Sequence, residues 1–172
     1  MAVRPLVQSN HPLLRRRAQR VTSFGAALQS LITDMVDTMR AQKGVGLAAP
    51  QIGIPQQVLV IQFSENEEDP ESSELYVLCN PKIVRRRGEE PGVEGCLSLP
   101  GFAGEVARAT MVTVKGWDAE GKPVRIRAQG FLARVFQHEI DHLHGKLYID
   151  RVESPENIWT VQPADEREVE SL

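Results

Sequence analysis

This sequence has little of what small extracellular domains and membrane proteins depend on. It contains two cysteines, Cys79 and Cys96, in 172 residues, and aromatic side chains account for 5% of the chain. Two cysteines cannot form a framework of disulfides, and the first residues contain no apolar export signal, so we expect reduced thiols and a cytoplasmic protein. The longest apolar runs are too short to span a bilayer, so we expect no membrane partner.

The composition is that of an ordinary globular domain. Apolar residues make up 41% and charged residues 25% of the 172 residues, which is enough chain to bury a core. We therefore expect a single domain over residues 1–172, in which about 155–172 form a polar acidic tail that frays.

The formal net charge of −3 hides an uneven distribution of charge. Residues 64–74 carry six carboxylates and no base, and the tail from Pro163 carries four carboxylates and one arginine. Of the 20 basic and 23 acidic residues, 19 and 13 lie elsewhere, with basic clusters at 15–20 and 85–87. Such clusters are ordinarily solvated surface, and the alternative is attraction to an anionic surface such as ribosomal RNA. No aromatic residues alternate with them, so we expect no sequence-specific nucleic-acid binding.

The hydrophobic pattern predicts a helix, then strands, then a second helix. Apolar residues at i, i+3, i+4 and i+7 predict an amphipathic helix from Thr22 or Ser23 to about Gly44. The second helix runs from Gly130 to Gly145. The predicted strands cover residues 58–63, 75–79, 82–87, 111–117, 123–128 and 148–152, with a hairpin over 111–128. This order predicts an α+β domain, with small antiparallel sheets packed around the second helix.

The second predicted helix carries the pattern His-Glu-x-x-His over residues 138–142. His138 and His142 are four residues apart, so a helix places both imidazoles on one face, where they can bind one metal ion. Glu139 then lies within reach of a water on that metal. The pattern is short and also arises by chance, so a purely structural pair of histidines is the alternative.

A catalytic metal needs a third protein ligand. His144 lies two residues beyond His142 and points about 200° away from it on a helical wheel, so we exclude it. Cys96, in a tight segment next to Gly95, would supply a thiolate and leave a fourth position for water. Cys79 also offers a sulfur, but it lies in a predicted strand, where a buried cysteine is ordinary.

These residue types suit hydrolysis of an amide. A metal would polarise a water, and Glu139 would accept its proton and pass it to the leaving nitrogen. A tetrahedral intermediate also needs hydrogen-bond donors for its oxyanion. The sequence offers an amide side chain such as Gln51 and the backbone N–H groups next to Cys96.

Three segments together resemble the signature motifs of the peptide deformylase family. They are Gly44-Val45-Gly46-Leu47-Ala48-Ala49-Pro50-Gln51, Glu94-Gly95-Cys96-Leu97-Ser98 and Gln137-His138-Glu139-Ile140-Asp141-His142. They stand in the family's order at compatible spacing, and the similarity extends from about residue 6 to about residue 150. The resemblance implies one catalytic domain, a hydrolase that removes the N-formyl group from the initiator methionine of nascent chains and releases formate.

The resemblance also implies a metal site. Cys96, His138 and His142 hold the metal, and Glu139 is the general acid and base. Thiolate and imidazole ligands alone favour zinc, whereas the family implies Fe(II) in the cell, with zinc, nickel or cobalt able to replace it. We follow the family and expect Fe(II).

The remaining implied residues act on the substrate. Gln51 and the backbone N–H of Leu97 hold the formyl oxygen as negative charge develops. The implied substrate-binding set is Val45, Gly46, Phe131 and Val135, the last two from an apolar strip on the second helix that would wall a methionine pocket. A flexible apolar pocket suits an unbranched thioether.

A group of charges is expected to support the metal site. Glu94, Arg108 and Asp141 form an ion network behind the site in this hypothesis, because Asp141 adjoins the ligand His142. The alternative is three independent surface charges.

The implied partners are N-formylmethionyl nascent peptides and, transiently, the ribosome. Some members of the family end in a long basic helix used at the ribosome, whereas the tail here is short and acidic. Two other classes stay open. A zinc metallopeptidase would share only His-Glu-x-x-His, and a binding module with structural zinc would need Cys79 as a fourth ligand.

Overall fold

The computed structural model describes residues 2–64, 68, 73–162 and 172. The chain has two α-helices, α1 (Ala26–Ala41) and α2 (Gly130–Leu143), among these residues. The strands are β1 (Gly46–Ala48), β2 (Val58–Phe63), β3 (Glu74–Arg87), β4 (Glu90–Cys96), β5 (Leu99–Arg108), β6 (Met111–Trp117), β7 (Pro123–Gln129) and β8 (Ile158–Thr160). Short 3₁₀ turns are η1 (Pro12–Arg15), η2 (Ala49–Ile52), η4 (Tyr148–Asp150) and η5 (Pro155–Asn157).

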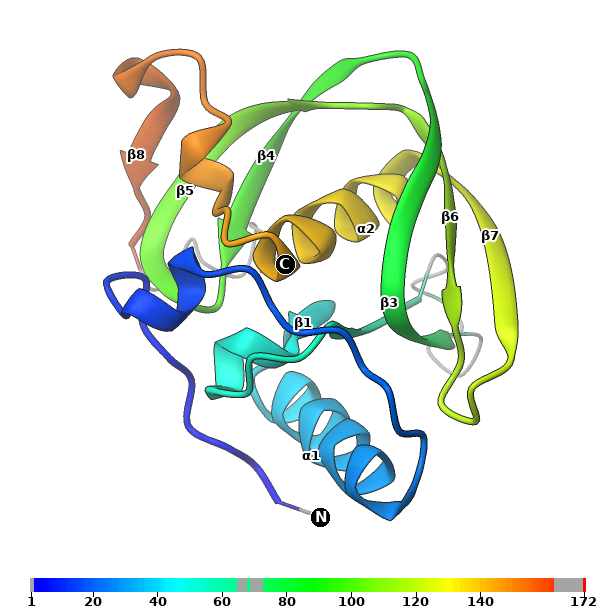
Figure 1. The fold of residues 1–172 in the computed structure, drawn as a ribbon. Coiled ribbons are helices and arrows are strands. Elements are labelled where there is room, and N and C mark those ends of the chain that lie inside the picture. Colours follow the sequence, from blue (N-terminus) through cyan, green and yellow to red (C-terminus); the bar gives the residue numbers. More distant parts are fainter. Residues whose placement is uncertain (1, 65–67, 69–72, 163–171) are drawn as a thin grey trace.

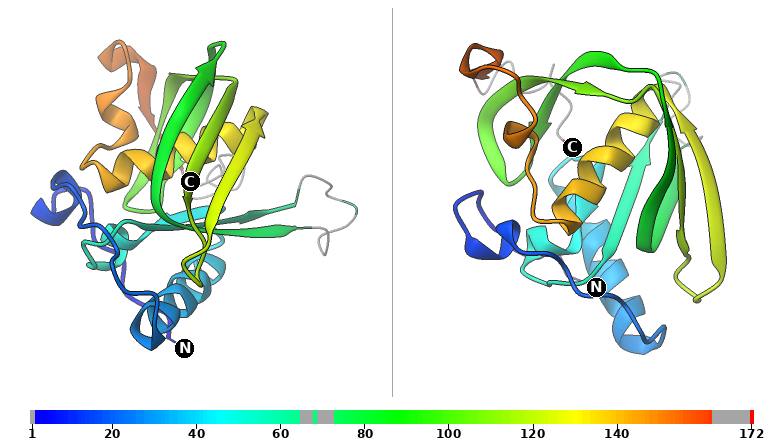
Figure 2. Two further views of the ribbon diagram at one scale, coloured as in Figure 1. Left: turned by 45° about the vertical axis from the view of Figure 1, so that its right-hand side comes forward. Right: turned by 45° about the horizontal axis from the view of Figure 1, so that its top comes forward.

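Two antiparallel sheets enclose α2 (Figure 1). The larger sheet has the order β1-β2-β3-β6-β7, and the smaller has the order β4-β5-β8. α2 crosses the middle of the molecule between them, and α1 lies on the other side of β1 (Figures 1 and 2). The predicted α+β class, with small antiparallel sheets around a central helix, is confirmed.

The core forms on both faces of the larger sheet. On one face Val112, Val114 and Ala128 pack with Val135 and Phe136 of α2, all of them buried. The apolar side chains of α1 cover the other face at the β1–β2 end. Met35 and Met39 of α1 form one buried cluster, the α1 cluster, with Leu47 of β1 and with Val58 and Val60 of β2. The larger sheet therefore holds α2, and with it the His-Glu-x-x-His motif, in place by packing against one side of the helix.

The ends of α1 differ from the prediction. The N-cap is Gly25, and neither Thr22 nor Ser23 caps the helix. At the other end Lys43, and not Gly44, has the left-handed backbone, with a φ of 55°. The N–H of Gly44 donates to the Met39 carbonyl at 3.0 Å, so the helix still closes over a left-handed residue.

Several predicted strand boundaries are wrong. The strands predicted at 75–79 and 82–87 are one strand, β3, which passes Asn80 and Pro81 through an irregular register. Asn80 adopts a φ of 50°, so the chain bends without leaving the sheet. No strand is predicted for residues 88–101, but they lie mostly in β4 and β5. The strand predicted at 148–152 is the 3₁₀ turn η4.

The predicted fraying tail from Pro155 is wrong for its first part. Pro155–Asn157 form η5, and Ile158–Thr160 form β8, which pairs with Phe102 to Gly104 of β5. The acidic remainder, residues 163–171, and most of the acidic segment 65–72 lie outside the described residues. Neither described α-helix is long and apolar enough to cross a membrane.

Candidate metal centre

α2 presents the two motif histidines side by side. His138 and His142 are each 1% exposed, and their ring centroids are 5.0 Å apart. The four-residue spacing sets both rings on one face of the helix. Twelve of the fourteen residues of α2 are buried, so this face points into the protein and away from bulk water.

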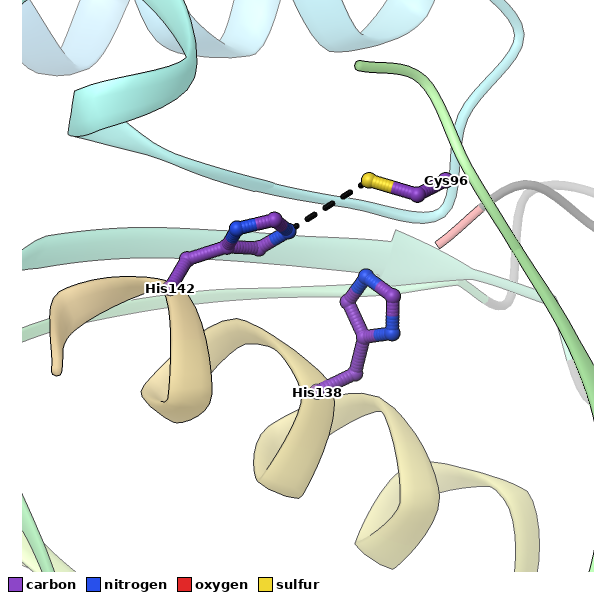
Figure 3. Close-up of side chains that lie close together, drawn as sticks. All are labelled: Cys96, His138 and His142. Atoms are coloured by element: carbon purple, nitrogen blue, oxygen red, sulfur yellow. Dashed lines mark hydrogen bonds between the residues drawn. The ribbon is translucent and has the colours of Figure 1, made fainter. Parts of the chain in front are cut away.

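Cys96 comes from the end of β4, where the chain turns tightly into β5 and Cys96 pairs with Leu99. Its Sγ lies 3.5 Å from Nε2 of His142 (Figure 3). Ligand atoms of Cys96, His138 and His142 all lie within 4.8 Å of one another. Among residues 2–64, 68, 73–162 and 172, this is the only such group of three or more metal-binding side chains.

The donor atoms fit a divalent metal ion. Nε2 of His138 is buried and has no hydrogen-bond partner among the described residues. Burial lowers the pKa of His142 well below its usual value, so this imidazole is neutral and able to ligate. Burial raises the pKa of the Cys96 thiol to about 12, so only a cation beside the sulfur would keep it as a thiolate. One sulfur and two nitrogens with an open fourth position are the donor set of a catalytic site.

Glu139 follows the first ligand and is completely buried. Neither carboxylate oxygen has a hydrogen-bond partner among the described residues. Burial and the nearby charge of Glu94 raise the pKa of Glu139 well above its usual value. A buried carboxyl group with a raised pKa holds a proton more readily than an ordinary glutamate, which suits a group that exchanges protons with a substrate.

β1 packs closely against Glu139. A Cβ atom placed on Gly46 would lie 2.7 Å from Oε1 of Glu139 and 3.0 Å from Cγ1 of Val135. The close packing of β1 against Glu139 therefore requires a glycine at position 46, whether or not Gly46 also contacts substrate.

Gln51 turns its amide toward the cysteine. Its Oε1 accepts from the N–H of Ala48 at 2.9 Å, which leaves the NH₂ group facing the centre. That group donates to Oγ of Ser98 at 3.2 Å and lies 3.6 Å from Sγ of Cys96. Leu97, between Cys96 and Ser98, is half-buried against the α1 cluster. The structure thus brings the amide of Gln51 and the Cys96 turn together.

The predicted ion network is present and larger than predicted. Arg108 donates to both oxygens of Glu94 at 2.9 Å and to Asp141 at 2.7 Å. Arg134 donates to Glu94 at 2.7 Å, and Arg151 donates to both oxygens of Asp141 at 2.8 Å. The alternative of three independent surface charges is wrong, since Glu94, Arg108 and Asp141 are buried.

This network fixes the tautomer of His138. Burial would raise the pKa of Glu94, but hydrogen bonds from Arg108 and His138 outweigh it and hold the pKa well below the usual range. The ionised Glu94 accepts from Nδ1 of His138 at 2.8 Å. Nδ1 therefore carries the proton, and Nε2 is left with a lone pair for a metal.

The predicted pocket residues converge on one apolar cluster. Val135 is buried in it, and Val45 and Phe131 pack against it partly exposed. Phe63 of β2 meets Phe131 edge to face with ring centroids 4.9 Å apart, a contact that the sequence did not indicate. Leu172 is 1% exposed in the same cluster, and its N–H donates to the carbonyl of Gly95 at 3.1 Å.

The excluded candidates lie elsewhere. His144 is exposed at the C-terminal end of α2 and does not belong to the ligand group. Cys79 is buried in the α1 cluster, and burial raises its pKa to about 11, so it stays a thiol. Tyr148, which sequence reasoning missed, stacks on His138 with a centroid distance of 6.1 Å and packs with Cys96.

Comparison with known proteins gives one consistent family. A family model described as polypeptide deformylase matches residues 3–157. A peptide deformylase of Dehalococcoides mccartyi is 42% identical over 166 residues, covering 96% of this chain and 96% of its own. A crystal structure of a peptide deformylase from Legionella pneumophila has a TM-score of 0.82 at 45% identity, covering 91% of this chain and 89% of that one. The Met-Ala-Ser-bound class I type b peptide deformylase from Acinetobacter baumannii has a TM-score of 0.81 at 35% identity, with coverages of 88% and 99%.

Proposed function

This chain belongs to the polypeptide deformylase family, as its three motifs predict, and on that premise we propose which of its residues carry the reaction. The protein is a hydrolase that removes the N-formyl group from the initiator methionine of nascent polypeptides. The net reaction adds water across the formyl C–N bond, and it yields formate and a free amino terminus.

In this proposal Cys96, His138 and His142 hold one divalent metal ion. A bound ion supplies Lewis acidity toward the attacking water and the formyl oxygen. The observation that carries the proposal is the approach of these three donors to within 4.8 Å, beside a buried glutamate without hydrogen-bond partners among the described residues.

Glu139 acts as the proton carrier. It accepts a proton from the attacking water, and it then donates a proton to the nitrogen that leaves as the C–N bond breaks. Its burial supports this role, because the same environment that raises its pKa also keeps bulk water from the carboxyl group.

Gln51 and Leu97 stabilise the formyl oxygen. The NH₂ group of Gln51 is already oriented by its bond with Ala48, so it need not reorganise as negative charge develops. The backbone N–H of Leu97 is the second donor in this proposal.

The substrate's methionine side chain contacts Phe131 and Val135, and its backbone lies along Val45 and Gly46. The apolar character of this cluster supports the assignment, since it already buries a leucine side chain, that of Leu172.

The activity is tested by two assays on one preparation. Formate release from formyl-Met-Ala should be rapid, whereas the unformylated peptide Met-Ala should stay intact. Peptide cleavage without formate release would favour the zinc metallopeptidase. The absence of both activities would favour a structural zinc site.

We further propose Fe(II) as the ion in the cell, which zinc, nickel or cobalt can replace. Enzyme purified without oxygen and loaded with Fe(II) should lose activity in air, whereas the nickel or cobalt form should keep it. Equal stability of all forms in air would count against iron.

The remaining proposals concern the cellular location, the domain organisation and the contact with the ribosome. We place the protein in the cytoplasm as a single catalytic domain, where it meets formylated nascent chains and contacts the ribosome transiently. Co-sedimentation with ribosomes at low salt tests the contact, and its absence at about 50 mM salt would argue against it.

A further inference from the structure

A group of six cations lies on the larger sheet, away from the metal centre. The register sets Lys82 opposite Lys115, and Lys115 opposite Arg125, across three neighbouring strands. Two further rows follow on the same face, one with Arg85 and Arg127, the other with Arg87. We call Lys82, Arg85, Arg87, Lys115, Arg125 and Arg127 the cationic sheet face.

This face is the one that α1 covers at the other end of the sheet. Trp117 packs against the α1 cluster, and Lys115 lies two residues before it, on the same side of β6. The alternate residues Val112 and Val114 are buried toward α2. In Figures 1 and 2 no described helix or strand lies over the side of β3, β6 and β7 that faces away from α2.

The charges on this face are of one sign. Its three rows contain no aspartate or glutamate, and none of the six cations forms an ion pair with another described residue. Asp118, in the adjoining hairpin turn, accepts from the N–H groups of Glu120 and Lys122. Like charges directly opposite on paired strands are destabilising. A face that only contacts solvent does not need like charges opposite one another. A bound anionic ligand would reduce the repulsion between them.

Two adjoining hollows follow the same cations. One, of about 520 Å³, is lined by Lys82, Lys115 and Arg125, and also by Arg20. The other, of about 230 Å³, is lined by Arg125, Arg127 and two cations of β3. Arg20 lies 4.8 Å from the centre of the Trp117 ring, so this arginine from the N-terminal segment joins the surface. The hollows share Arg125 and together follow cations from all three rows, so an anion with several charged groups, such as a polymer, can meet more of them than a single ion can.

We propose that the cationic sheet face binds the phosphate backbone of RNA without reading its bases. Four of the six cations are arginines, whose planar forks suit phosphate. Trp117 is the only aromatic residue that lines the hollows, and Arg20 already lies over its ring, so bases have little surface for stacking. Of the large apolar side chains that line the hollows, only Val84 is strongly exposed, which is too little for insertion into a membrane. The inference rests on the proposed function, because an enzyme of nascent chains works among ribosomal RNA.

The test measures binding of a labelled RNA duplex of 20 base pairs by fluorescence anisotropy between 50 and 200 mM salt. If each of the six cations meets one phosphate, log K should fall with log salt at a slope of about −5. The double variant Lys115→Glu with Arg125→Glu should weaken binding at least about tenfold and reduce the slope by about 2. The neutral pair Lys115→Gln with Arg125→Gln should act in the same direction and covers the case in which the reversed protein fails to fold.

The matched control is Arg40→Glu with Lys43→Glu, at the end of α1, which gives the same net charge and should leave RNA binding near the wild-type value. Formyl-Met-Ala turnover should be unchanged in every variant, so loss of RNA binding is distinguishable from failure of the proposed function. RNA affinity that falls equally in both reversed pairs would overturn the proposal. So would binding of polyglutamate or of phosphatidylserine vesicles that RNA does not displace, since the partner would then be an acidic protein or a membrane.

Discussion

Glu139 has the only buried carboxylate, among the described residues, whose oxygens lack hydrogen-bond partners. Glu139→Gln keeps the size of the side chain but removes the proton carrier. We expect kcat for formyl-Met-Ala to fall about 10²- to 10⁴-fold, because general acid–base catalysis contributes that much. Metal content should stay at the wild-type level, since Glu139 is not a ligand in the proposal.

Formate release and elemental analysis on the same sample check this prediction. Glu105→Gln is the control, because Glu105 is exposed on β5 and should have no effect. Activity of the Glu139→Gln protein above about a tenth of wild type would refute the assigned role.

Glu94 acts on the metal through His138. Glu94→Gln leaves Arg108 and Arg134 without their shared carboxylate and weakens the bond that fixes the His138 tautomer. We expect metal affinity to fall about 10- to 100-fold, as for other residues that orient a ligand. Competition with a chelator at several concentrations measures the affinity, and thermal unfolding reports any loss of stability separately. Unchanged affinity in a folded protein would show that Glu94 supports the fold alone.

The sequence predicted which cysteine lies beside the two histidines, but it did not predict the full ion network. Cys79 lies in a strand pattern and Cys96 in a tight glycine-containing segment, and this local contrast favoured Cys96. Arg134 and Arg151 reach Glu94 and Asp141 from residues 40 and 10 positions away in the chain. A signal existed only for Arg134, because a charged residue within the apolar stripe of a helix is rarely buried without a partner.

β1 and α2 meet at a contact that tolerates no side chain. In Gly46→Ala the new methyl group would lie 2.7 Å from Oε1 of Glu139, so either the strand or the carboxylate must shift. We expect kcat/KM to fall at least about tenfold and stability to fall by about 1–3 kcal/mol, as for other overpacked sites. Formate-release kinetics and denaturant unfolding measure the two effects.

Gly25→Ala is the matched control for this contact. The nearest atom to a Cβ at Gly25 is 3.9 Å away, so deformylation should be unchanged. Wild-type kcat/KM in Gly46→Ala would mean that β1 can withdraw from Glu139 at no cost to catalysis.

The elements with strong periodicity were predicted, and those rich in glycine and proline were not. The β6–β7 hairpin and α2 match the prediction within about two residues, because their apolar residues alternate or recur at helical spacing. β4 and β5 contain Pro91, Gly92, Pro100 and Gly101, which normally indicate turns. Pairing between β4 and β5 overrides those local preferences, and this pairing is what carries Cys96 to α2.

The three family motifs are far apart in sequence, and the fold brings them together because both sheets pack around α2. The Gly46–Gln51 segment belongs to the larger sheet and its adjoining turn, and Cys96 ends a strand of the smaller one. α2 packs on the larger sheet and reaches Glu94 of the smaller one through Arg134 and His138, so it can hold two proposed ligands at a fixed spacing. The cationic sheet face lies outside this convergence, so RNA binding and deformylation can be altered independently.

Leu172 connects the far end of the described chain with the centre. Its N–H donates to Gly95, next to Cys96, and its side chain shares a buried cluster with Val135. A side chain in this position would compete with the substrate's methionine.

In Leu172→Asp the new side chain should leave the cluster, because burying an unpaired carboxylate is strongly unfavourable. We expect KM for formyl-Met-Ala to fall about two- to tenfold with kcat unchanged, since a larger fraction of the enzyme is then competent to bind. Leu172→Met is the control and should keep the wild-type KM. A KM that rises in Leu172→Asp would instead mean that Leu172 helps to build the pocket.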